Sequence, residues 1–400
     1  YLAEARAYGA MVAGLAKPYS AWPVSSDVRD ERPLRVGLVS GDLKAHPVGF
    51  FLEGIAASLN PARVELVAYV TGTQEDMVTT RIKRLFAAWN SLVGMSDADA
   101  ARRIRDDGVH LLIDLAGHTA HNRLPLFAWK PAPVQVSWLG YWASTGVPGM
   151  DYLLADRVSV PQQQQAQFTE TIWYLPDTRL CFTPPADSAK IPLSPLPMMR
   201  NGYITFGSFQ KLGKINAGVL ALWGRIFRAV PNARLRLQNR QMNCPVAREQ
   251  IRDQLASYGI APERVAIERE VPREDYLAAH AEVDIILDTF PFPGGTTTCE
   301  ALWMGVPTLT LAGATMLGRQ GASMLACAGL DDWIASDEED YVARAAFHAM
   351  DIERLAQLRM GLRERVKDSP LFDGARFAQN LEQALHEMWH NRKPQELERE

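Results

Sequence analysis

The stretch DIILDTFPFPGGTTTCEALWMG, residues 284–305, contains an apolar run, then a loop rich in proline and glycine, then the start of a helix. An uninterrupted apolar strand is typical of a parallel sheet that is covered by helices on both faces. The loop glycines let the backbone approach a ligand closely, and the three threonines that follow open the helix. The stretch therefore predicts one strand–loop–helix unit of an α/β fold.

The same alternation extends to both sides of this stretch. Apolar runs predict strands at 34–40, 64–71, 109–117, 133–140, 151–156, 172–176, 204–210, 234–239, 265–270, 284–290 and 308–313. Helices are expected near 48–59, 75–89, 96–108 and 216–230, with two long helices at about 338–366 and 374–390. Strands that alternate with helices predict parallel, doubly wound sheets.

The chain has 400 residues, more than one compact core usually holds, so two domains are expected. Prolines crowd residues 183–202, and because proline interrupts helices and central strands, this segment is interpreted as a linker. The expected organisation is a helical segment at 1–26, a Rossmann-like domain at 27–182, the linker at 183–202, a second Rossmann-like domain at 203–370, and a C-terminal helix with a fraying tail at 371–400. Two such domains facing each other would place a site in the cleft beyond the carboxyl ends of both sheets.

Composition and charge exclude several classes of protein. The 42 basic and 46 acidic residues give a formal net charge of −4, which argues against nucleic acid as the main partner. No apolar run approaches the roughly 20 residues that span a bilayer, so no membrane partner is expected. The 4 cysteines are scattered without a C-x-x-C pair, which argues against zinc and fits a reducing, cytoplasmic location. The chain begins at Tyr1 rather than Met, so we expect it to be a piece of a longer one.

The loop and helix start within 284–305 predict a phosphate cradle. The first N–H groups of a helix have no partner inside the helix and carry partial positive charge. Gly295 gives close access, Thr296 and Thr297 add hydroxyl donors, and Glu300, one turn further on, can accept hydrogen bonds from ribose hydroxyls. Plain N-capping by threonine is the alternative that these residues leave open.

Two lysines lie in FGSFQKLGKIN, residues 206–216, directly after the first strand of the second half. Lys211 and Lys214 therefore lie at the carboxyl end of a strand, where a parallel sheet places its ligand. A lysine in this position can neutralise the charge that develops on a departing diphosphate. The competing interpretation is a pair of solvated loop lysines.

An acid–base pair is predicted in VSGDLKAHPVGFF, residues 39–51, the loop after the first strand of the first half. Asp42 and His46, with Lys44 between them, are candidates for proton transfer with an acceptor hydroxyl. The alternative is that Asp42 or His46 only caps the helix that follows.

Metal sites are not expected. His118 and His121 follow a buried strand but lack a carboxylate at ligand spacing, and His110 at the start of that strand is interpreted as structural. Leu139 and Gly140, in the loop after another strand, are interpreted as the wall of a pocket.

The D-x-D triplet at 97–99 is typical of metal-dependent sugar-nucleotide transferases. It follows Ser96, a good N-cap, and acidic residues favour the first turn of a helix because of the helix dipole. We therefore interpret the triplet as part of a helix start and not as a metal site.

Taken together, several segments resemble the O-GlcNAc transferase / SPINDLY family, and bacterial members in particular. The segments occur in the family's order and are LRVGLVSGDLKAHP, DGVHLLIDLAGHT, KPAPVQVSWLGYWASTG, MDYLLAD, FQKLGKIN and LDTFPFPGGTTTCEALWMGVPTLTLAG. The resemblance covers most of residues 33–390. It implies a glycosyltransferase-B fold preceded by tetratricopeptide repeats, of which the N-terminal helical segment would be the tail.

The resemblance also implies an inverting, metal-independent transfer of GlcNAc from UDP-GlcNAc to Ser or Thr hydroxyls of acceptor proteins. His46 matches the histidine proposed as the family's base, and Asp42 matches an aspartate with a rival claim through a water relay. Lys214 matches the lysine that stabilises the diphosphate leaving group. Thr296 and Thr297 match the diphosphate-binding threonines.

Other matched positions concern the nucleoside. Glu300 falls where animal enzymes carry a ribose-binding aspartate, Arg273 where a lysine contacts the nucleobase, and Tyr276 where a histidine packs near it. Lys211 stands in place of a glutamine and Gly295 in place of a histidine. This form is closer to the SPINDLY branch, some of whose members use GDP-fucose.

Several functions therefore compete. The leading prediction is a protein O-GlcNAc transferase without a metal or other cofactor. A GDP-fucose-dependent protein O-fucosyltransferase is the variant within the class. A sugar-nucleotide epimerase or hydrolase would need no protein acceptor, and a UDP-sugar-binding sensor would transfer nothing.

Overall fold

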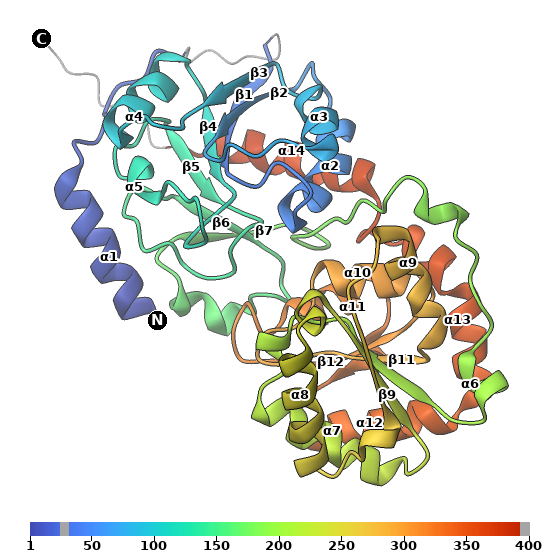
Figure 1. Ribbon diagram of the computed structural model, residues 1–400. Helices are drawn as coiled ribbons and strands as arrows, with labels where there is room; N and C mark the ends of the chain where they lie inside the picture. Colours follow the sequence, from blue (N-terminus) through green and yellow to red (C-terminus); the bar gives the residue numbers. More distant parts are fainter. Residues whose placement is uncertain (25–31, 393–400) are drawn as a thin grey trace, which may run out of the picture. The chain divides into compact units, whose positions relative to one another are not determined.

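The computed structural model describes residues 1–24 and 32–392. The chain forms two compact units (Figure 1): unit 1 comprises Tyr1–Thr183 together with the segment from Asp373, and unit 2 comprises Pro184–Phe372. The expected tail at 393–400 lies outside the described residues, as do residues 25–31, where the expected helical segment meets the first domain.

Unit 1 is built on a parallel sheet of seven strands. In their order across the sheet the strands are β3 (Ala88–Ser91), β2 (Val64–Val70), β1 (Leu34–Ser40), β4 (Leu111–Asp114), β5 (Val134–Ser137), β6 (Tyr152–Ala155) and β7 (Thr171–Tyr174). The chain moves outward from β1 in one direction and then resumes at β4 in the other. The strand order therefore reverses between β1 and β4, which makes this pair the topological switch point of a doubly wound sheet.

Helices cover both faces of this sheet (Figure 1). They are α1 (Leu2–Leu15), α2 (Pro47–Ser58), α3 (Met77–Lys83), α4 (Asp97–Asp106), α5 (Leu124–Phe127) and α14 (Gly374–His390). The last of these follows unit 2 in the chain but packs against α2. The Arg376 guanidinium on α14 donates two hydrogen bonds of 2.7 Å to the Asp177 carboxylate.

Unit 2 repeats the plan with a parallel sheet of six strands. Across the sheet they are β10 (Val265–Glu268), β9 (Arg234–Gln238), β8 (Thr205–Ser208), β11 (Ile285–Leu287), β12 (Thr308–Leu311) and β13 (Ile334–Ala335). Its helices are α6 (Pro197–Asn201), α7 (Ala217–Ala229), α8 (Pro245–Ser257), α9 (Arg273–Ala278), α10 (Thr296–Trp303), α11 (Gln320–Cys327), α12 (Glu338–Met350) and α13 (Ile352–Lys367). The switch point of this sheet lies between β8 and β11.

Short 3-10 helices occur in both units. They are η1 (Gln162–Gln167), η2 (Ser188–Lys190), η3 (Leu212–Lys214), η4 (Arg240–Asn243), η5 (Pro262–Arg264), η6 (Ala279–Glu282) and η7 (Asp331–Trp333). Of these, η3 follows β8 directly and therefore shapes one side of the switch point in unit 2.

The predicted alternation of strands and helices is confirmed in both units, and so is the N-cap at Ser96, whose hydroxyl accepts from the N–H of Asp99 at 3.1 Å. The expected helix at 75–89 is wrong in its second half. It ends at Lys83, and residues 88–91 form the edge strand β3. Because β3 pairs only with β2 and remains partly exposed, it lacks the apolar run that marks the buried strands.

The expected helix at 338–366 is also two helices, α12 and α13. The chain breaks at Asp351, whose carboxylate accepts from the N–H of Arg354 at 3.2 Å and caps α13. Strand β13 was not predicted, because two residues carry no periodicity.

The proline-rich segment at 183–202 lies almost wholly in unit 2 and contains a short helix, α6. Pro197 is the first residue of α6, where a helix needs no N–H donor and tolerates proline. The Asp284 carboxylate accepts from the N–H of Met198 at 3.0 Å, and Arg359 donates to the carbonyl of Ser194 at 2.8 Å. These contacts fasten the segment to unit 2.

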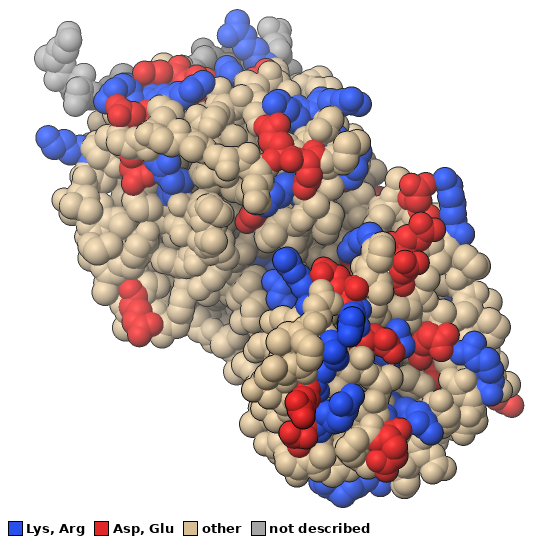
Figure 2. Space-filling view, viewed as in Figure 1, with Lys and Arg blue, Asp and Glu red and all other residues tan. Residues whose placement is uncertain are grey.

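The face drawn in Figure 2 shows Lys and Arg side chains interspersed with Asp and Glu side chains. That face therefore offers no continuous basic field of the kind that binds nucleic acid phosphates. In the part of the chain that the structure describes, no helix is both long and apolar enough to cross a membrane.

Candidate functional site

The switch point of unit 2 brings two loops together at the carboxyl edge of the sheet. In doubly wound sheets the loops after the two central strands depart toward opposite faces and leave a crevice between them, which is where ligands bind. Here these are the loop 209–216 after β8 and the loop 288–295 after β11. They carry most of the residues that the sequence predicts for a diphosphate site.

Lys214 connects the two loops. It ends η3, and its ammonium donates to the carbonyl of Pro293 at 2.8 Å while lying 3.8 Å from the centroid of the Phe292 ring. Burial lowers the pKa of Lys214 to about 8, although the nearby Asp288 carboxylate acts in the opposite direction. The structure thus places Lys214 against the loop that leads into the threonines. Lys211, at the start of the same turn, is exposed.

The three threonines open α10, as the sequence predicts, but they do not cap it. The N-cap position is Gly295, which has no side chain, and no side chain caps this helix end. Within the described residues, the buried hydroxyls of Thr296 and Thr298 have no hydrogen-bond partner. The first turn of α10 therefore presents N–H groups and hydroxyls that a ligand can use.

Asp288 closes the loop that precedes α10. Its fully buried carboxylate accepts from the N–H groups of Thr289 at 2.9 Å and Gly294 at 2.7 Å, and from the hydroxyl of Thr310 at 2.9 Å. Burial raises the pKa of Asp288, and these hydrogen bonds and Lys214 counteract the increase. The carboxylate therefore fixes the loop while sitting beneath it.

Two buried glutamines contact the loop and helix start that the sequence predicts as a phosphate cradle. The Gln210 amide nitrogen lies 2.8 Å from the Thr297 hydroxyl and 3.4 Å from Asp288 Oδ1. The Gln320 amide nitrogen donates to the carbonyl of Gly294 at 3.1 Å. A Cβ at Gly294 would lie 2.4 Å from the Gln210 amide nitrogen, and a Cβ at Gly295 would lie 3.1 Å from that of Gln320. Gly294 thus leaves the space that the Gln210 amide occupies, whereas at Gly295 the Gln320 amide would have to move by only a few tenths of an ångström.

Glu300, Arg273 and Tyr276 form one cluster beside the cradle. Glu300 on α10 is only 2% exposed, and its carboxylate forms an ion pair with Arg273 and accepts from the Tyr276 hydroxyl at 2.8 Å. Burial raises the pKa of Glu300, while Arg273 and then Tyr276 lower it. The Tyr276 ring packs edge-on against Phe209, which follows β8. The three residues predicted for the nucleoside therefore lie together.

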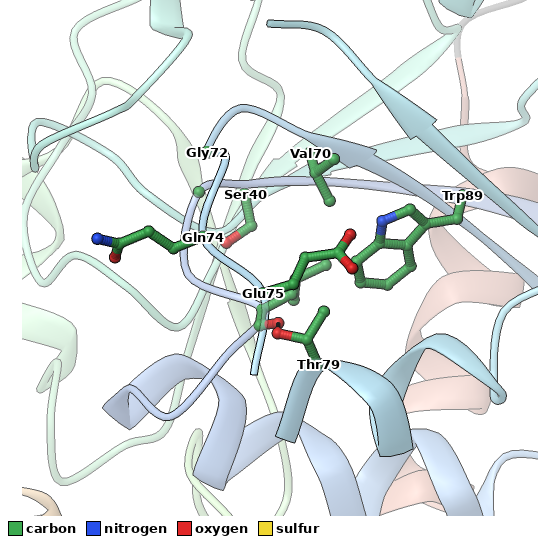
Figure 3. Close-up of a pocket in the computed structure, with 9 residues that line it drawn as sticks. Ser40, Val70, Gly72, Gln74, Glu75, Thr79 and Trp89 are labelled. Carbon is green, nitrogen blue, oxygen red and sulfur yellow. Dashed lines mark hydrogen bonds between the residues drawn. The ribbon is translucent and has the colours of Figure 1, made fainter. Parts of the chain in front are cut away.

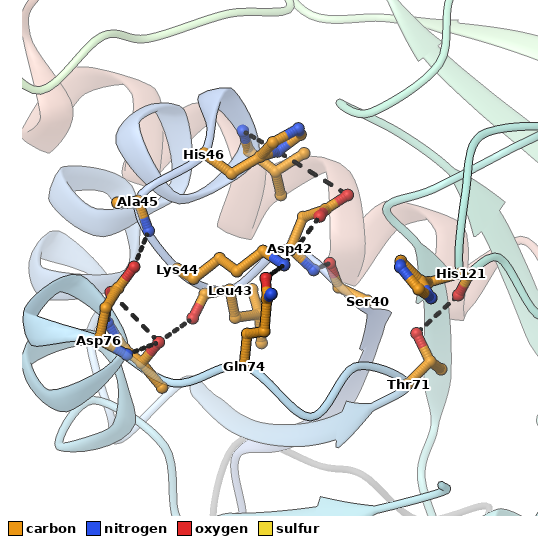
Figure 4. Close-up of polar contacts among 12 residues, drawn as sticks. Ser40, Asp42, Leu43, Lys44, Ala45, His46, Thr71, Gln74, Asp76 and His121 are labelled. Atoms are coloured by element: carbon orange, nitrogen blue, oxygen red, sulfur yellow. Dashed lines mark hydrogen bonds and ion pairs between the residues drawn. The ribbon is translucent and has the colours of Figure 1, made fainter.

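The loop after β1 in unit 1 holds the predicted acid–base pair (Figure 4). His46 caps α2, because its Nδ1 accepts from the N–H of Val48 at 3.4 Å, and the same atom lies 3.7 Å from Asp42 Oδ2. The side chain of His46 is 41% exposed and that of Asp42 is 14% exposed. Lys44 lies 4.0 Å from Asp42 and donates to the Gln74 amide oxygen at 2.9 Å. His46 Nδ1 thus caps α2 and also faces the Asp42 carboxylate, so the two predicted residues lie together in one loop.

The remaining predicted residues of unit 1 are engaged in packing. His118 Nε2 is bonded to the Thr145 carbonyl at 2.8 Å, and the His121 carbonyl accepts from the Thr71 hydroxyl at 2.7 Å. Leu139 is 6% exposed, and a Cβ at Gly140 would lie 1.8 Å from the Leu115 carbonyl oxygen. Gly140 therefore packs tightly against the chain that follows β4, and Leu139 beside it is buried.

The two acidic residues of the D-x-D triplet are each paired with an arginine. Asp97 forms an ion pair of 2.8 Å with Arg123, and Asp99 one of 3.0 Å with Arg102. His110 Nδ1 accepts from the N–H of Arg35 at 3.0 Å, a structural role as predicted. Across residues 1–24 and 32–392, no three His, Cys, Asp or Glu side chains are grouped so that they could hold a metal ion.

Sequence reasoning missed part of this arrangement. Asp288 and Gln210 lie inside segments that the sequence singles out, and a polar residue at the end of an apolar strand is the signal that could have identified them. Gln320 carries no such signal. A pocket at the carboxyl ends of β1 and β2 (Figure 3) was not predicted either. Its lining residues are Ser40, Gly41, Leu43, Val70, Gly72, Gln74, Glu75, Thr79 and Trp89.

Known proteins match almost the whole chain. The model of glycosyl transferase family 41 matches residues 11–182 and 196–381. A SPINDLY protein of Petunia hybrida, named as a probable UDP-N-acetylglucosamine–peptide N-acetylglucosaminyltransferase, is 39% identical over 383 residues, which are 94% of this chain and 40% of that protein. A SPINDLY protein of Arabidopsis thaliana with the same name is 36% identical over 376 residues, 93% of this chain and 41% of its own length. The chain thus spans about two fifths of the length of these curated relatives.

Solved structures show the same similarity. An O-GlcNAc transferase mutant of Thermobaculum terrenum matches with a TM-score of 0.90 and 36% identity, covering 97% of this chain and 73% of that one. Anabaena HepE, solved with UDP and glucose, matches with a TM-score of 0.55 at 12% identity, covering 88% of this chain and 100% of its own. At that identity the second match concerns the fold alone.

Proposed function

The chain belongs to glycosyl transferase family 41, and we propose that it transfers N-acetylglucosamine from UDP-GlcNAc to serine or threonine hydroxyls of proteins, with inversion and without a metal ion. Its two Rossmann-like units are those of the glycosyltransferase-B fold. The names of the SPINDLY relatives support the donor and the acceptor class.

A single observation carries this proposal: the Lys214 ammonium lies against the loop that leads into the threonine-led turn of α10, and its hydrogen bond to Pro293 spans the switch point. When the glycosidic bond breaks, its electron pair passes to the diphosphate of UDP. A lysine ammonium and the N-terminus of a helix are the groups that stabilise such charge. A bound diphosphate would also keep Lys214 protonated despite its burial.

The acceptor hydroxyl must lose its proton as it attacks the sugar. His46 is the proposed base because its side chain is the more exposed of the pair. Asp42 Oδ2 lies 3.7 Å from His46 Nδ1, and a proton on Nδ1, in place of the hydrogen bond from the Val48 N–H, would let Asp42 orient the imidazole. A positioned base of this kind typically contributes about 10²–10⁴-fold in rate. Asp42 acting through a water molecule is the rival assignment.

The other predicted residues receive roles in donor binding. Lys211 would add positive charge near the diphosphate. Glu300 would bind the ribose, with Arg273 and Tyr276 at the nucleobase, and the ion pair and hydrogen bond among them would hold Glu300 in place until the nucleotide arrives.

One alternative donor is favoured by a specific observation. Gly295 leaves room that the Gln320 amide approaches, whereas the animal enzymes that the sequence resembles carry a histidine there. This difference favours a changed sugar pocket, and GDP-fucose is the donor to compare. A sensor that binds the nucleotide sugar without transferring it is the non-enzymatic alternative.

The test is a thermal-shift panel with UDP, UDP-GlcNAc, GDP and GDP-fucose, with and without EDTA, followed by a transfer assay on protein acceptors with labelled donor. A ligand at 100 times its dissociation constant stabilises the folded state by about 2.7 kcal/mol. We expect UDP to stabilise, EDTA to change nothing, and label to appear on Ser or Thr. Selective stabilisation by GDP would overturn the donor, and binding without transfer would favour the sensor.

A further inference from the structure

We propose that Gln210 is a positioning residue that makes the Thr297 hydroxyl a hydrogen-bond donor to the diphosphate, and that Asp288 in turn fixes the orientation of the Gln210 amide. The inference rests on the proposed function, because it assumes that the ligand is a nucleoside diphosphate. All three residues belong to unit 2 and come from three different parts of the switch point.

The three side chains form a chain of contacts in which Gln210 touches both Asp288 and Thr297. Gln210 follows β8 and is 3% exposed, Asp288 follows β11 and is 1% exposed, and Thr297 lies in the first turn of α10. The Gln210 amide nitrogen lies 3.4 Å from Asp288 Oδ1 and 2.8 Å from Thr297 Oγ1. The second contact is a short hydrogen bond, and the first is a longer one.

Asp288 decides which end of the Gln210 amide faces it. Asp288 Oδ1 already accepts two backbone N–H groups, from Thr289 and Gly294, so it acts as an acceptor here. An amide oxygen facing it would bring two acceptor atoms together, whereas the amide nitrogen offers a donor. The nitrogen therefore faces Asp288, and its other hydrogen points to Thr297.

This arrangement decides what the Thr297 hydroxyl can do. A threonine hydroxyl has one hydrogen and two acceptor lone pairs. Because Gln210 donates to one lone pair, the hydroxyl hydrogen remains for another partner. Phosphate oxygens accept hydrogen bonds, and a hydroxyl whose oxygen already accepts from Gln210 keeps its hydrogen for a bound diphosphate.

The hydrogen bonds from Gln210 to Asp288 and to Thr297, called the relay below, are confined by close packing. Gly294 lies where the Gln210 amide nitrogen and the Thr297 and Thr298 hydroxyls converge, and a Cβ there would lie 2.4 to 2.7 Å from all three. By contrast, the hydroxyls of Thr296 and Thr298 have no partner within the described residues, so nothing in the protein orients them. Thr297 therefore differs from its two neighbours, although the sequence presents them as equivalent.

The test is a double-mutant cycle on UDP affinity measured by calorimetry. Gln210→Met keeps the length of the side chain and removes the donor, and Thr297→Val removes the hydroxyl. We expect each change to weaken UDP binding about tenfold, the usual effect of a lost hydrogen bond to a charged group. The double variant should be no weaker than Thr297→Val alone. Binding of uridine, which has no phosphate, should not change.

Thr296→Val provides the matched control, since Gln210 makes no contact with Thr296 in the relay. Combined with Gln210→Met, it should show additive losses. The relay is refuted if Gln210→Met binds UDP as tightly as the wild type, or if its effect adds fully to that of Thr297→Val.

Two further variants keep the test decisive if Gln210→Met does not fold. Gln210→Glu preserves the shape but turns the donor into an acceptor that captures the Thr297 hydroxyl, so UDP affinity should fall at least as far. Thr297→Ser keeps the hydroxyl and should bind within about twofold of the wild type. Unchanged affinity in Gln210→Glu contradicts the proposal. If the wild type binds GDP instead, the cycle is run with GDP, and a wild type that binds neither nucleotide refutes the proposed function itself.

Discussion

The two units have the same kind of parallel sheet but differ in the loops at their switch points. Each has a buried aspartate at the strand across its switch point: Asp114 ends β4 in unit 1, and Asp288 follows β11 in unit 2. Asp114 accepts from the N–H groups of Ala116 at 3.1 Å and Gly117 at 2.7 Å, which closes a tight turn. Asp288 reaches Gly294, six residues on, and so holds a much wider loop.

The wider loop of unit 2 brings together groups that the tight turn of unit 1 does not carry. In unit 2 it meets Lys214 and leads into the open first turn of α10, so positive charge and donors gather at one point. In unit 1 the turn is closed tightly by Asp114, and the predicted acid–base residues, Asp42 and His46, lie instead on the loop after β1. The same kind of sheet thus provides the position in each unit, and under the proposed function the loops determine whether a unit binds an anion or moves a proton.

The largest effect should come from removing the cation of unit 2. Lys214→Ala should lower the rate of sugar transfer by about 10³-fold, the loss expected when a donor to developing negative charge is removed. UDP affinity should fall by about tenfold only, because the charge is greatest in the transition state. The measurement compares the change in kcat with the change in the UDP dissociation constant between the wild type and Lys214→Ala. Lys211→Ala is the control in the same loop, and we expect it to change both values less.

Equal and modest losses of kcat and UDP affinity in Lys214→Ala would mean that the lysine only binds the nucleotide. In that case the contrast between an anion-stabilising unit 2 and a proton-transferring unit 1 would lose its main support.

The next largest effect should come from unit 1. His46→Ala should lower kcat by about 10²-fold, within the range for a general base, and leave UDP affinity unchanged. Asp42→Asn should have a smaller effect if Asp42 only orients the imidazole. Steady-state kinetics of both variants decide the matter: near-normal turnover of His46→Ala together with a large loss in Asp42→Asn would transfer the role of base to Asp42.

Gly294→Ala should disrupt the wide loop itself. Its Cβ would lie 2.4 Å from the Gln210 amide nitrogen and the Thr298 hydroxyl, so overpacking should cost about 1–3 kcal/mol of unfolding free energy and weaken UDP binding. Gly213→Ala is the matched control, because no atom lies within 4 Å of a Cβ there. Chemical denaturation and calorimetry would follow both variants. A Gly294→Ala protein with normal stability and affinity would show that the amide and hydroxyls are not confined as described.

The smallest effect is a pH dependence. Burial lowers the pKa of Lys214 to about 8, so the free protein loses this proton as the pH rises through 8, while the bound diphosphate requires the ammonium. UDP affinity should therefore be constant well below pH 8, fall as the pH rises above 8, and level off at the roughly tenfold loss expected for Lys214→Ala. Lys214→Arg should remove this dependence, because arginine stays protonated. Calorimetry from pH 6.5 to 9.5 tests it, and a wild-type affinity that rises with pH would falsify this assignment of the proton.

Much of the fold follows from the sequence because strands buried on both faces are written as apolar runs. Strand β1 was predicted with both of its ends, and the start of α10 at Thr296 was predicted as well. The parts that were not predicted have two different causes. Strand β3 is a partly exposed edge, and the packing of α14 on unit 1 depends on contacts such as Arg376 with Asp177, which are 199 residues apart.

The candidate site, like the fold, was predictable from the sequence only in part. Lys214, Thr296 and Thr297 follow strands that flank a switch point, so their proximity can be deduced from topology. Gln210 and Asp288 bond to other groups of the protein, and although a polar residue after an apolar strand marks their positions, no motif marks what they bond to. Only the hydrogen bonds between loops that follow different strands make it visible.

The central claim is that the widened loop of unit 2 holds a nucleoside diphosphate. The most direct measurement is a crystal structure of the wild type with UDP. The account predicts that the β-phosphate accepts hydrogen bonds from Lys214 Nζ and from the Thr297 hydroxyl and N–H, with Gln210 still bonded to Thr297. A UDP molecule bound elsewhere, with Lys214 still on the Pro293 carbonyl, would contradict it.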